Sequence, residues 1–135
     1  MKRILSRVLA IALVALIGLT GCSTGASGVD GLTGDYKQDT IAVIDSLRTA
    51  INLPDNDSGK IEAQSEAKQQ INAFASRYRR NSSVANLSSF ATMRTALNAL
   101  AGHYSAYPNR PVPQKLKKRL EQEFKQVEAA IQRGA

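Results

Sequence analysis

Apolar residues recur with helical spacing along the chain from Asp35 onward, and no segment alternates apolar and polar residues with a period of two. This spacing predicts an all-helical chain. Turn residues separate the apolar stretches. Pro54 and Gly59 end the first predicted helix, and three prolines stiffen residues 107–113. The predicted elements are a helix at 35–52 capped by Asp35 or Thr33, a helix at 60–79, a third helix capped by Ser88 or Ser89, and a fourth with Pro113 as its first residue.

Each predicted helix carries one apolar stripe, and four such helices with short connections favour an antiparallel up-down-up-down four-helix bundle, an all-α fold. A haem or metal bundle would need inward-facing ligands, and the chain has one histidine and one cysteine. The stripes therefore predict a core. Its expected members are Tyr36, Thr40, Val43, Ile44, Leu47, Ile51, Ile61, Ala67, Ile71, Phe74, Ala75, Tyr78, Phe90, Met93, Leu97, Leu100, Tyr104, Leu116, Leu120, Phe124, Val127 and Ile131.

The first residues have the pattern of an export signal. Residues 1–7 carry three cations and no acid, and residues 8–17 form an unbroken apolar run. Even residues 8–19 would span only about 18 Å as a helix, whereas a bilayer core is about 30 Å thick. The sequence "LTGC" that follows resembles the lipobox of bacterial lipoproteins, in which the cysteine is acylated and the signal is cut before it. We expect a cleaved signal at residues 1–21 and lipid on Cys22; the alternative is a secreted protein with a chance cysteine.

Residues 22–34 are expected to join this anchor to the bundle at 35–135. The segment after Cys22 is rich in glycine, serine and threonine, with a glycine at every third position from residue 25 to residue 34. Twelve such residues form a flexible tether with a random-coil span of about 20 Å. Two or three acyl chains would hold the protein firmly at a membrane surface.

The residues offer no catalytic signature, so we expect no enzyme, no metal and no cofactor. His103 is the only histidine, and a structural role near the end of the third helix is the simpler interpretation. Glu121 and Glu123 are two residues apart on a helix and point to different faces. The segment "DNDSG" at 55–59 lacks the glutamate that would complete a calcium loop.

Charge is distributed unevenly along the sequence. Residues 22–67 hold eight acids and three cations, whereas residues 68–135 hold twelve cations and three acids. A salt-bridged surface would explain most of this asymmetry. It does not explain a cluster of cations in the first turns of the fourth helix, where the helix dipole is already positive and each cation is unfavourable by roughly 0.3–1 kcal/mol.

That cluster is our candidate for binding a partner, together with residues of the preceding corner. Its expected partner is an acidic protein surface; anionic lipid is the alternative, and nucleic acid is not expected outside the cytoplasm. Tyr107 has a second interpretation as a plug at the end of the bundle. The candidates are Arg110, Lys115, Lys117, Lys118 and Arg119, with Tyr104 and Tyr107 as secondary members.

The sequence also resembles a known family over essentially the whole mature chain. The segments that carry the likeness are "GDYKQDTIAVIDSLRTAINLP", "SRYRR", "TALNALAGHYSAYPNRPVP" and "KLKKRLEQEFKQ". They look very like the small lumenal lipoprotein that helps photosystem II to assemble and to be repaired in cyanobacteria. The resemblance implies a four-helix bundle anchored on the lumenal side of the thylakoid membrane.

The same resemblance implies a function without catalysis or a cofactor. It implies transient binding to immature or damaged photosystem II, at the large lumenal loop of a chlorophyll-binding inner antenna subunit, and support for assembly of the manganese–calcium cluster. Only Cys22 is carried over as a family residue. We expect a monomer when the protein is free. The alternatives are a generic envelope lipoprotein that binds an anionic polymer or scaffolds another complex, and a minor enzyme.

Overall fold

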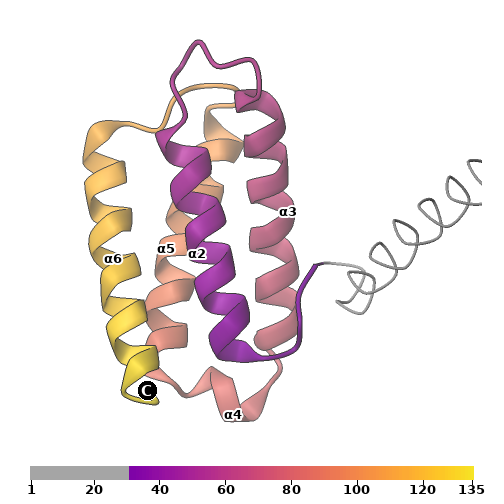
Figure 1. Cartoon of the computed structure of the whole chain (residues 1–135), viewed down its shortest axis with the longest axis vertical. Coiled ribbons are helices and arrows are strands. Elements are labelled where there is room, and N and C mark those ends of the chain that lie inside the picture. The colour runs from indigo at the N-terminus through magenta and orange to yellow at the C-terminus, as the bar shows by residue number, and fades with distance from the viewer. Residues whose placement is uncertain (1–30) are drawn as a thin grey trace, which may run out of the picture. The chain divides into compact units, whose positions relative to one another are not determined.

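The computed structural model describes residues 31–135, so the predicted signal at 1–21 and the predicted lipid on Cys22 lie outside the described residues (Figure 1). Residues 35–135 form one compact unit. The described residues contain helices and no strand, which confirms the all-α prediction. The helices are α2 (Tyr36–Asn52), α3 (Lys60–Tyr78), α4 (Ser82–Ala85), α5 (Ser88–Ala106) and α6 (Gln114–Gln132).

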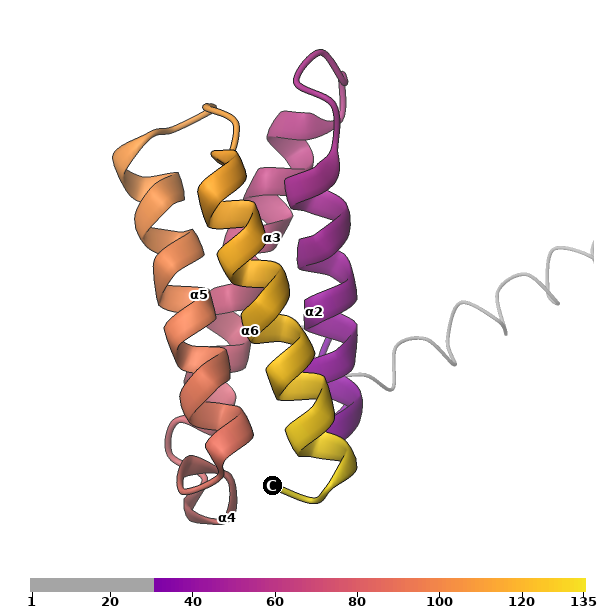
Figure 2. The ribbon, with the colours of Figure 1, turned by 90° about the vertical axis from the view of Figure 1, so that its left-hand side faces the viewer.

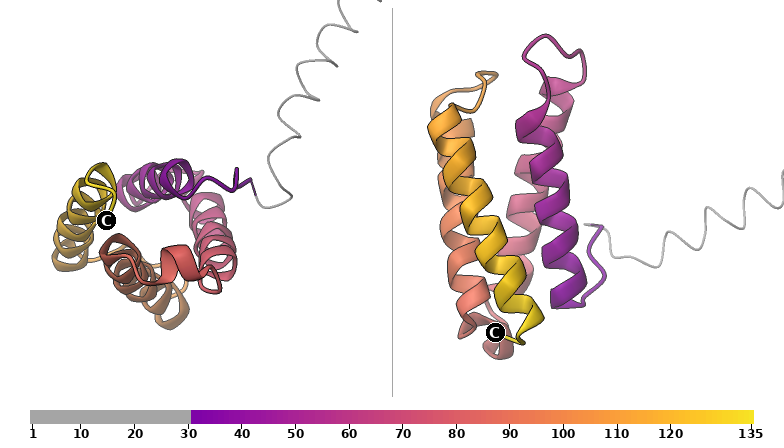
Figure 3. Two further views of the ribbon diagram at one scale, coloured as in Figure 1. Left: turned by 90° about the horizontal axis from the view of Figure 1, so that it is seen from below. Right: turned by 60° about the vertical axis from the view of Figure 1, so that its left-hand side comes forward.

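The four long helices of residues 35–135 form the predicted antiparallel bundle (Figures 1 and 2). Seen along its axis, α2 lies between α3 and α6, and α5 lies on the other side between the same two helices (Figure 3). The closest packing is between α5 and α6 and between α2 and α3. The corner at 107–113 joins α5 to α6, and the loop at 53–59 joins α2 to α3. Both connections lie at the same end of the bundle, the upper end in Figure 1.

The caps of the helices agree only in part with the sequence-based expectations. Asp35 caps α2 as predicted, because its Oδ1 accepts the Gln38 N–H at 2.9 Å. Neither Ser88 nor Ser89 caps α5, whose N-cap is Leu87 without a side-chain hydrogen bond. Ser89 is instead buried, and its hydroxyl lies 2.7 Å from the Tyr36 hydroxyl. A serine that has a buried partner from another helix is not available to cap its own.

Two other helix boundaries also differ from the prediction. Residues 82–85 form the short helix α4, whose N-cap Asn81 accepts the Ser83 N–H at 3.1 Å. The apolar pattern predicts no helix over these residues. Pro113 is the N-cap of α6 rather than its first helical residue, and its ψ of 149° keeps it extended.

Most of the predicted core is buried. Ile61 is the clear error: it is the second residue of α3, in the first turn of that helix, and is 65% exposed. Tyr36, Ala75 and Leu116 are half-buried. The predicted core residues that the structure buries are Thr40, Val43, Ile44, Leu47, Ile51, Ala67, Ile71, Phe74, Tyr78, Phe90, Met93, Leu97, Leu100, Tyr104, Leu120, Phe124, Val127 and Ile131.

The core also contains polar groups that the apolar pattern did not predict. Asp39 on α2 is 2% exposed and accepts a hydrogen bond from the Tyr78 hydroxyl on α3. Burial, followed by this hydrogen bond to a carboxylate, raises the pKa of Tyr78. Gln64 is 5% exposed, and its amide donates to the backbone oxygen of Arg110 at 3.4 Å. These contacts tie α3 to α2 and to the α5–α6 corner.

Candidate partner-binding surface

The candidate residues that the sequence identified lie at the end of the bundle where α5 turns into α6, the upper end in Figure 1. The corner is held by local backbone geometry. Asn109 has a φ of 62°, in the left-handed region that asparagine tolerates better than most residues. The Arg110 N–H donates to the Tyr107 backbone oxygen at 3.2 Å, which closes the turn. Proline at 111 and 113 then restricts the chain up to the start of α6.

A surface hollow of about 370 Å³ lies at this corner. The rings of His103 and Tyr107 stand 5.5 Å apart between centroids, at an interplanar angle of 35°. Tyr107 is 58% exposed, so it does not plug the core. The corner therefore combines aromatic and proline surface with one guanidinium. The hollow is lined by His103, Tyr107, Arg110, Pro111 and Pro113.

Two neighbouring residues near the end of α5 each have a buried polar atom with no hydrogen-bond partner among the described residues. The two atoms are His103 Nε2 and the Tyr104 hydroxyl. Burial raises the pKa of Tyr104 to about 12. Tyr104 is only 1% exposed, so its side chain belongs to the core and is not offered to a partner. His103 was expected to have a structural role, but its Nε2 is not satisfied by the bundle.

The cations of the candidate surface fall into two groups. Arg119 pairs with Glu123 one turn further along α6, at 3.3 Å between Nε and Oε1. Lys117 is half-buried, and its charge contributes to lowering the pKa of Asp55 in the loop at 53–59, after the larger effect of a hydrogen bond from Lys60. Both cations are thus partly engaged within the bundle.

Arg110, Lys115 and Lys118 form the other group, which we call the free cations. All three residues are exposed, and their side chains have no ion pair within residues 31–135. Lys115 and Lys118 are three residues apart and are neighbours on the surface of α6. A cation at a helix N-terminus costs stability unless something else compensates for it. The free cations therefore remain the part of the cluster that the bundle does not explain.

The tether joins the bundle at the opposite end. The tether leads into Asp35, just before the start of α2, at the lower end of the bundle in Figure 1. The free cations lie at and just before the start of α6, which is at the upper end because α6 runs antiparallel to α2 (Figures 1 and 2). The 19 residues of α6 have a length of about 28 Å. The other basic segment, "SRYRR" at 76–80, ends α3 on the tether side. The two basic clusters are thus separated by the length of the bundle.

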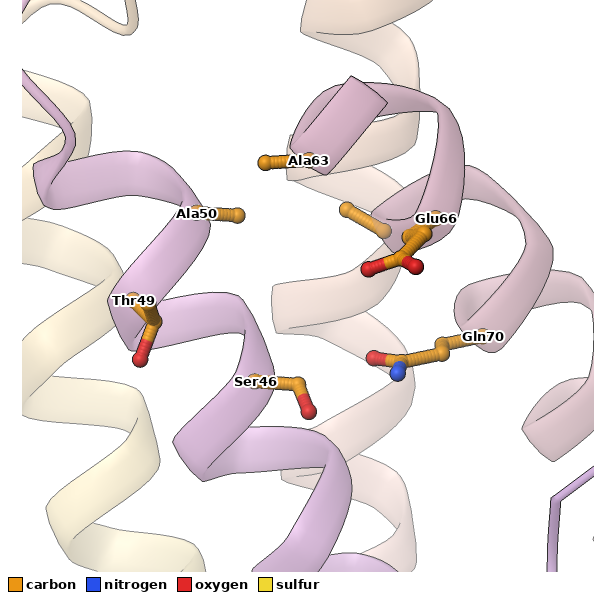
Figure 4. A pocket seen from close by; sticks show the side chains of 7 residues that line it. Ser46, Thr49, Ala50, Ala63, Glu66 and Gln70 are labelled. Carbon is orange, nitrogen blue, oxygen red and sulfur yellow. The ribbon is translucent and has the colours of Figure 1, made fainter. Parts of the chain in front are cut away.

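A second hollow, of about 190 Å³, lies between α2 and α3 (Figure 4). Alanines at 50, 63 and 67 leave the space, and Ser46, Glu66 and Gln70 point along its sides. Glu66 is the one ionisable group of the lining, and no hydrogen bond joins it to Ser46, so the hollow does not show the paired nucleophile and base of nucleophilic catalysis. The hollow is the consequence of small residues facing each other across two helices.

Within residues 31–135, no three side chains of histidine, cysteine, aspartate or glutamate gather closely enough to hold a metal ion. None of the helices in that range has the length and the apolar character needed to cross a bilayer.

Fold and surface together define a small four-helix bundle with a cationic corner at one end. Comparison with known families identifies the bundle further. The family model described as Photosystem II Pbs27 matches residues 4–131. The chain therefore belongs to this photosystem II family, in agreement with the resemblance noted in the sequence.

Individual relatives give the same result. The chain is 62% identical over 104 residues to the Photosystem II assembly factor lipoprotein Psb27 of Thermosynechococcus vestitus, covering 77% of this chain and 78% of that protein. It is 53% identical over 134 residues to the Photosystem II lipoprotein Psb27 of Synechocystis, covering 99% and 97%. The solution structure of Psb27 from cyanobacterial photosystem II superimposes with a TM-score of 0.75 at 51% identity, covering 82% of this chain and 96% of that one.

Proposed function

We propose that this protein is a non-catalytic assembly and repair factor, anchored by lipid to the lumenal side of the thylakoid membrane. It transiently binds immature or damaged photosystem II at the large lumenal loop of a chlorophyll-binding inner antenna subunit. While bound, it supports assembly of the manganese–calcium cluster. Family membership and the names of the relatives, which include assembly factor and lipoprotein, support the general role. The subunit and the lumenal side come from the family resemblance of the sequence.

The observation that carries the proposal is the position of the free cations. Arg110, Lys115 and Lys118 are exposed and unpaired within the described residues, at the bundle end remote from the tether. A cluster held close to the headgroups would favour an anionic lipid as its partner. Cations at the far end are in a position to meet an acidic protein surface. Charged contacts of this kind give fast association and easy release.

The anchor and the surface have complementary roles in this proposal. Acyl chains on Cys22 would confine the bundle to a thin layer at the membrane, where photosystem II is embedded. Confinement raises the effective concentration of the partner without any new contact. A weak, salt-sensitive surface is then sufficient for binding, and the factor can dissociate when assembly is complete.

The test is to remove the free lysines while leaving the internal ion pairs intact. We would replace Lys115 and Lys118 by glutamine together, and compare that variant with a matched control in which Lys68 and Lys125 are replaced. The control residues are also exposed lysines, each without an ion pair among the described residues. Tagged protein would be recovered from thylakoid membranes, and the chlorophyll-binding subunits in the eluate would be quantified.

We expect the Lys115/Lys118 variant to recover severalfold less photosystem II than the control, with an unchanged circular dichroism spectrum. Equal recovery by both variants would remove the free lysines from the mechanism. Charge reversal at Lys117, Lys118 and Arg119 is a less specific test, because Arg119→Glu would face Glu123 within the same helix and Lys117→Glu would face Asp55.

A generic envelope lipoprotein that binds an anionic polymer would share the anchor, the tether and the basic corner. The same pull-down distinguishes it. Recovery of polymer without chlorophyll-binding subunits would support that alternative.

A further inference from the structure

We propose that the hollow at the α5–α6 corner is a binding site for a carboxylate side chain of the partner protein. The inference rests on the proposed function and adds the chemistry of the contact. Arg110 would pair with the carboxylate, and His103 Nε2 would donate a hydrogen bond to it. The ring of Tyr107 and the two prolines would pack against the carbon atoms of the acidic side chain.

The imidazole of His103 has an unsatisfied nitrogen. The His103 side chain lines the hollow, and its Nε2 is buried and has no hydrogen-bond partner among the described residues, so a ligand in the hollow reaches that atom only when the ring turns. A buried polar atom left without a partner costs roughly 1–3 kcal/mol. Such an atom marks a position where an external group of the right chemistry gains more than it would elsewhere on the surface. When Nε2 carries a proton, that group must be an acceptor.

Neighbouring rings and backbone hydrogen bonds hold the corner around the hollow. His103 lies between two tyrosine rings, with centroid distances of 6.0 Å to Tyr104 and 5.5 Å to Tyr107. Both backbone polar groups of Arg110 are hydrogen-bonded, its N–H to the Tyr107 oxygen and its carbonyl to the Gln64 amide. Because the backbone of the corner is already held, binding a ligand has to order only side chains, which lowers the entropy cost.

The charge of this surface also favours an acidic occupant. Arg110 has no ion pair within residues 31–135, and Lys115 and Lys118 follow it on α6 without acidic partners. This surface repels cations and attracts an acidic chain. Guanidinium forms two parallel hydrogen bonds with a carboxylate, which makes that pair stronger and more specific than a simple charge contact. The apolar walls favour a carboxylate on a carbon stem, as in aspartate or glutamate.

A lipid headgroup is the competing anionic partner, and the hollow would meet it only if the bundle turned over on its tether. The tether joins the bundle at Asp35, at the opposite end from the hollow. We therefore commit to an acidic segment of a protein as the occupant, and the lipid becomes one outcome of the test.

The direct test uses the fact that His103 is the only histidine of the chain. In the lipidated protein in detergent micelles, its imidazole signals in a proton–carbon NMR spectrum need no assignment, provided that the affinity tag contains no histidine. We would titrate the protein with acetate, and with acetamide as a neutral probe of the same shape. The variants are Arg110→Gln for the site and Lys125→Gln as the exposed control.

We expect acetate to move the His103 signal saturably at millimolar concentration, and acetamide to leave it unchanged. Arg110→Gln should abolish the response, whereas Lys125→Gln should retain it. An acetate response that Arg110→Gln leaves intact would overturn the proposal, as would a response to acetamide equal to that to acetate.

The second test uses photosystem II assembly intermediates. Arg110→Gln and His103→Phe should each weaken binding by about tenfold, the size expected for losing one charge-assisted hydrogen bond. His103→Gln, which restores a donor in a similar position, should recover part of the loss. Bound intermediate should also abolish the acetate response.

These outcomes separate the proposal from the function on which it rests. Unchanged binding of Arg110→Gln and His103→Phe, with weakened binding of the Lys115/Lys118 variant, would reject the hollow and keep the function. A wild-type protein that does not bind the intermediates would reject the function. Binding to phosphatidylglycerol vesicles that is lost in Arg110→Gln, without a change in binding to the intermediates, would assign the site to lipid and overturn the proposal.

Discussion

Arg48 on α2 and Glu121 on α6 form a two-pronged ion pair across the bundle. Arg48 Nε lies 3.1 Å from Glu121 Oε2, and Nη2 lies 2.9 Å from Oε1. The same guanidinium donates to Glu128, about two turns further along α6, and lies 5.9 Å from the centre of the Phe124 ring. In this cluster the cation, Arg48, comes from the acidic N-terminal half of the sequence, and the acids, Glu121 and Glu128, come from the basic C-terminal half.

We predict that this ion pair stabilises the bundle more than an exposed pair does. Arg48 is only 26% exposed at its side chain, whereas Arg119, which pairs with Glu123, is 54% exposed. Arg48→Gln should lower the free energy of unfolding by roughly 1–2 kcal/mol, because two glutamates lose a charged donor. Arg119→Gln should change it by about 0.5 kcal/mol or less. Urea unfolding followed by circular dichroism measures both, and equal effects would contradict the prediction.

Two buried tyrosines should respond in opposite ways to loss of their hydroxyl. The Tyr78 hydroxyl donates to buried Asp39, so Tyr78→Phe should cost roughly 1–3 kcal/mol of unfolding free energy. The Tyr104 hydroxyl is buried and has no partner among the described residues. Tyr104→Phe should therefore be neutral, or stabilise the protein by up to about 1 kcal/mol. Thermal unfolding of the two variants, which differ from wild type by the same single oxygen, provides the comparison.

Burial of Tyr104 should also make the protein less stable at high pH. Burial raises its pKa from 10.0 to about 12, so above pH 10 the unfolded chain loses the proton while the folded chain keeps it. Stability contributed by this group is complete below pH 10 and falls as the pH rises toward 12. Urea midpoints would be measured from about pH 9 to about pH 11.5, which begins below the unfolded pKa of tyrosine and ends near the raised pKa of Tyr104. They should fall less steeply with pH for Tyr104→Phe than for wild type. Parallel curves would show that Tyr104 does not contribute.

The helices and most of the core could be predicted because they depend on local features. Apolar residues at intervals of three and four define a buried face wherever the chain is helical, and Asp35 needs only Gln38, three residues away, to cap α2. The family resemblance rested on longer segments and was confirmed by the family match.

The polar contacts could not be predicted because their partners are distant in sequence. Tyr78 is 39 residues from Asp39, and Arg48 is 73 residues from Glu121. Nothing near Asp39 marks an aspartate that will be buried. The hollow likewise depends on how the corner folds, including the positive φ of Asn109, and periodicity says nothing about it. His103 could have been noticed only as the single histidine beside the candidate residues.

Ile61 shows the limit of the apolar pattern, and it can be tested against a true core residue. Ile61 is 65% exposed, whereas Ile71 on the same helix is 4% exposed. Ile61→Ala should change the free energy of unfolding by less than about 0.5 kcal/mol. Ile71→Ala should lower it by about 2–4 kcal/mol, because it removes buried methyl groups and leaves a cavity. A large loss for Ile61→Ala would indicate that the first turn of α3 is covered in solution.

The lipid anchor on Cys22 is the prediction with the widest consequences for function. Intact-mass spectrometry of protein purified from membranes should find residue 22 at the new N-terminus, carrying a diacylglyceryl group and an added acyl chain. A variant with Cys22→Ser, exported by an unrelated signal, should keep the same urea midpoint, because residues 35–135 contain no cysteine. It should bind isolated assembly intermediates with unchanged affinity but recover far less photosystem II from membranes, since confinement no longer raises the local concentration. An unmodified thiol at residue 22 in the wild-type protein would contradict the anchor and leave the bundle to find its partner by diffusion alone.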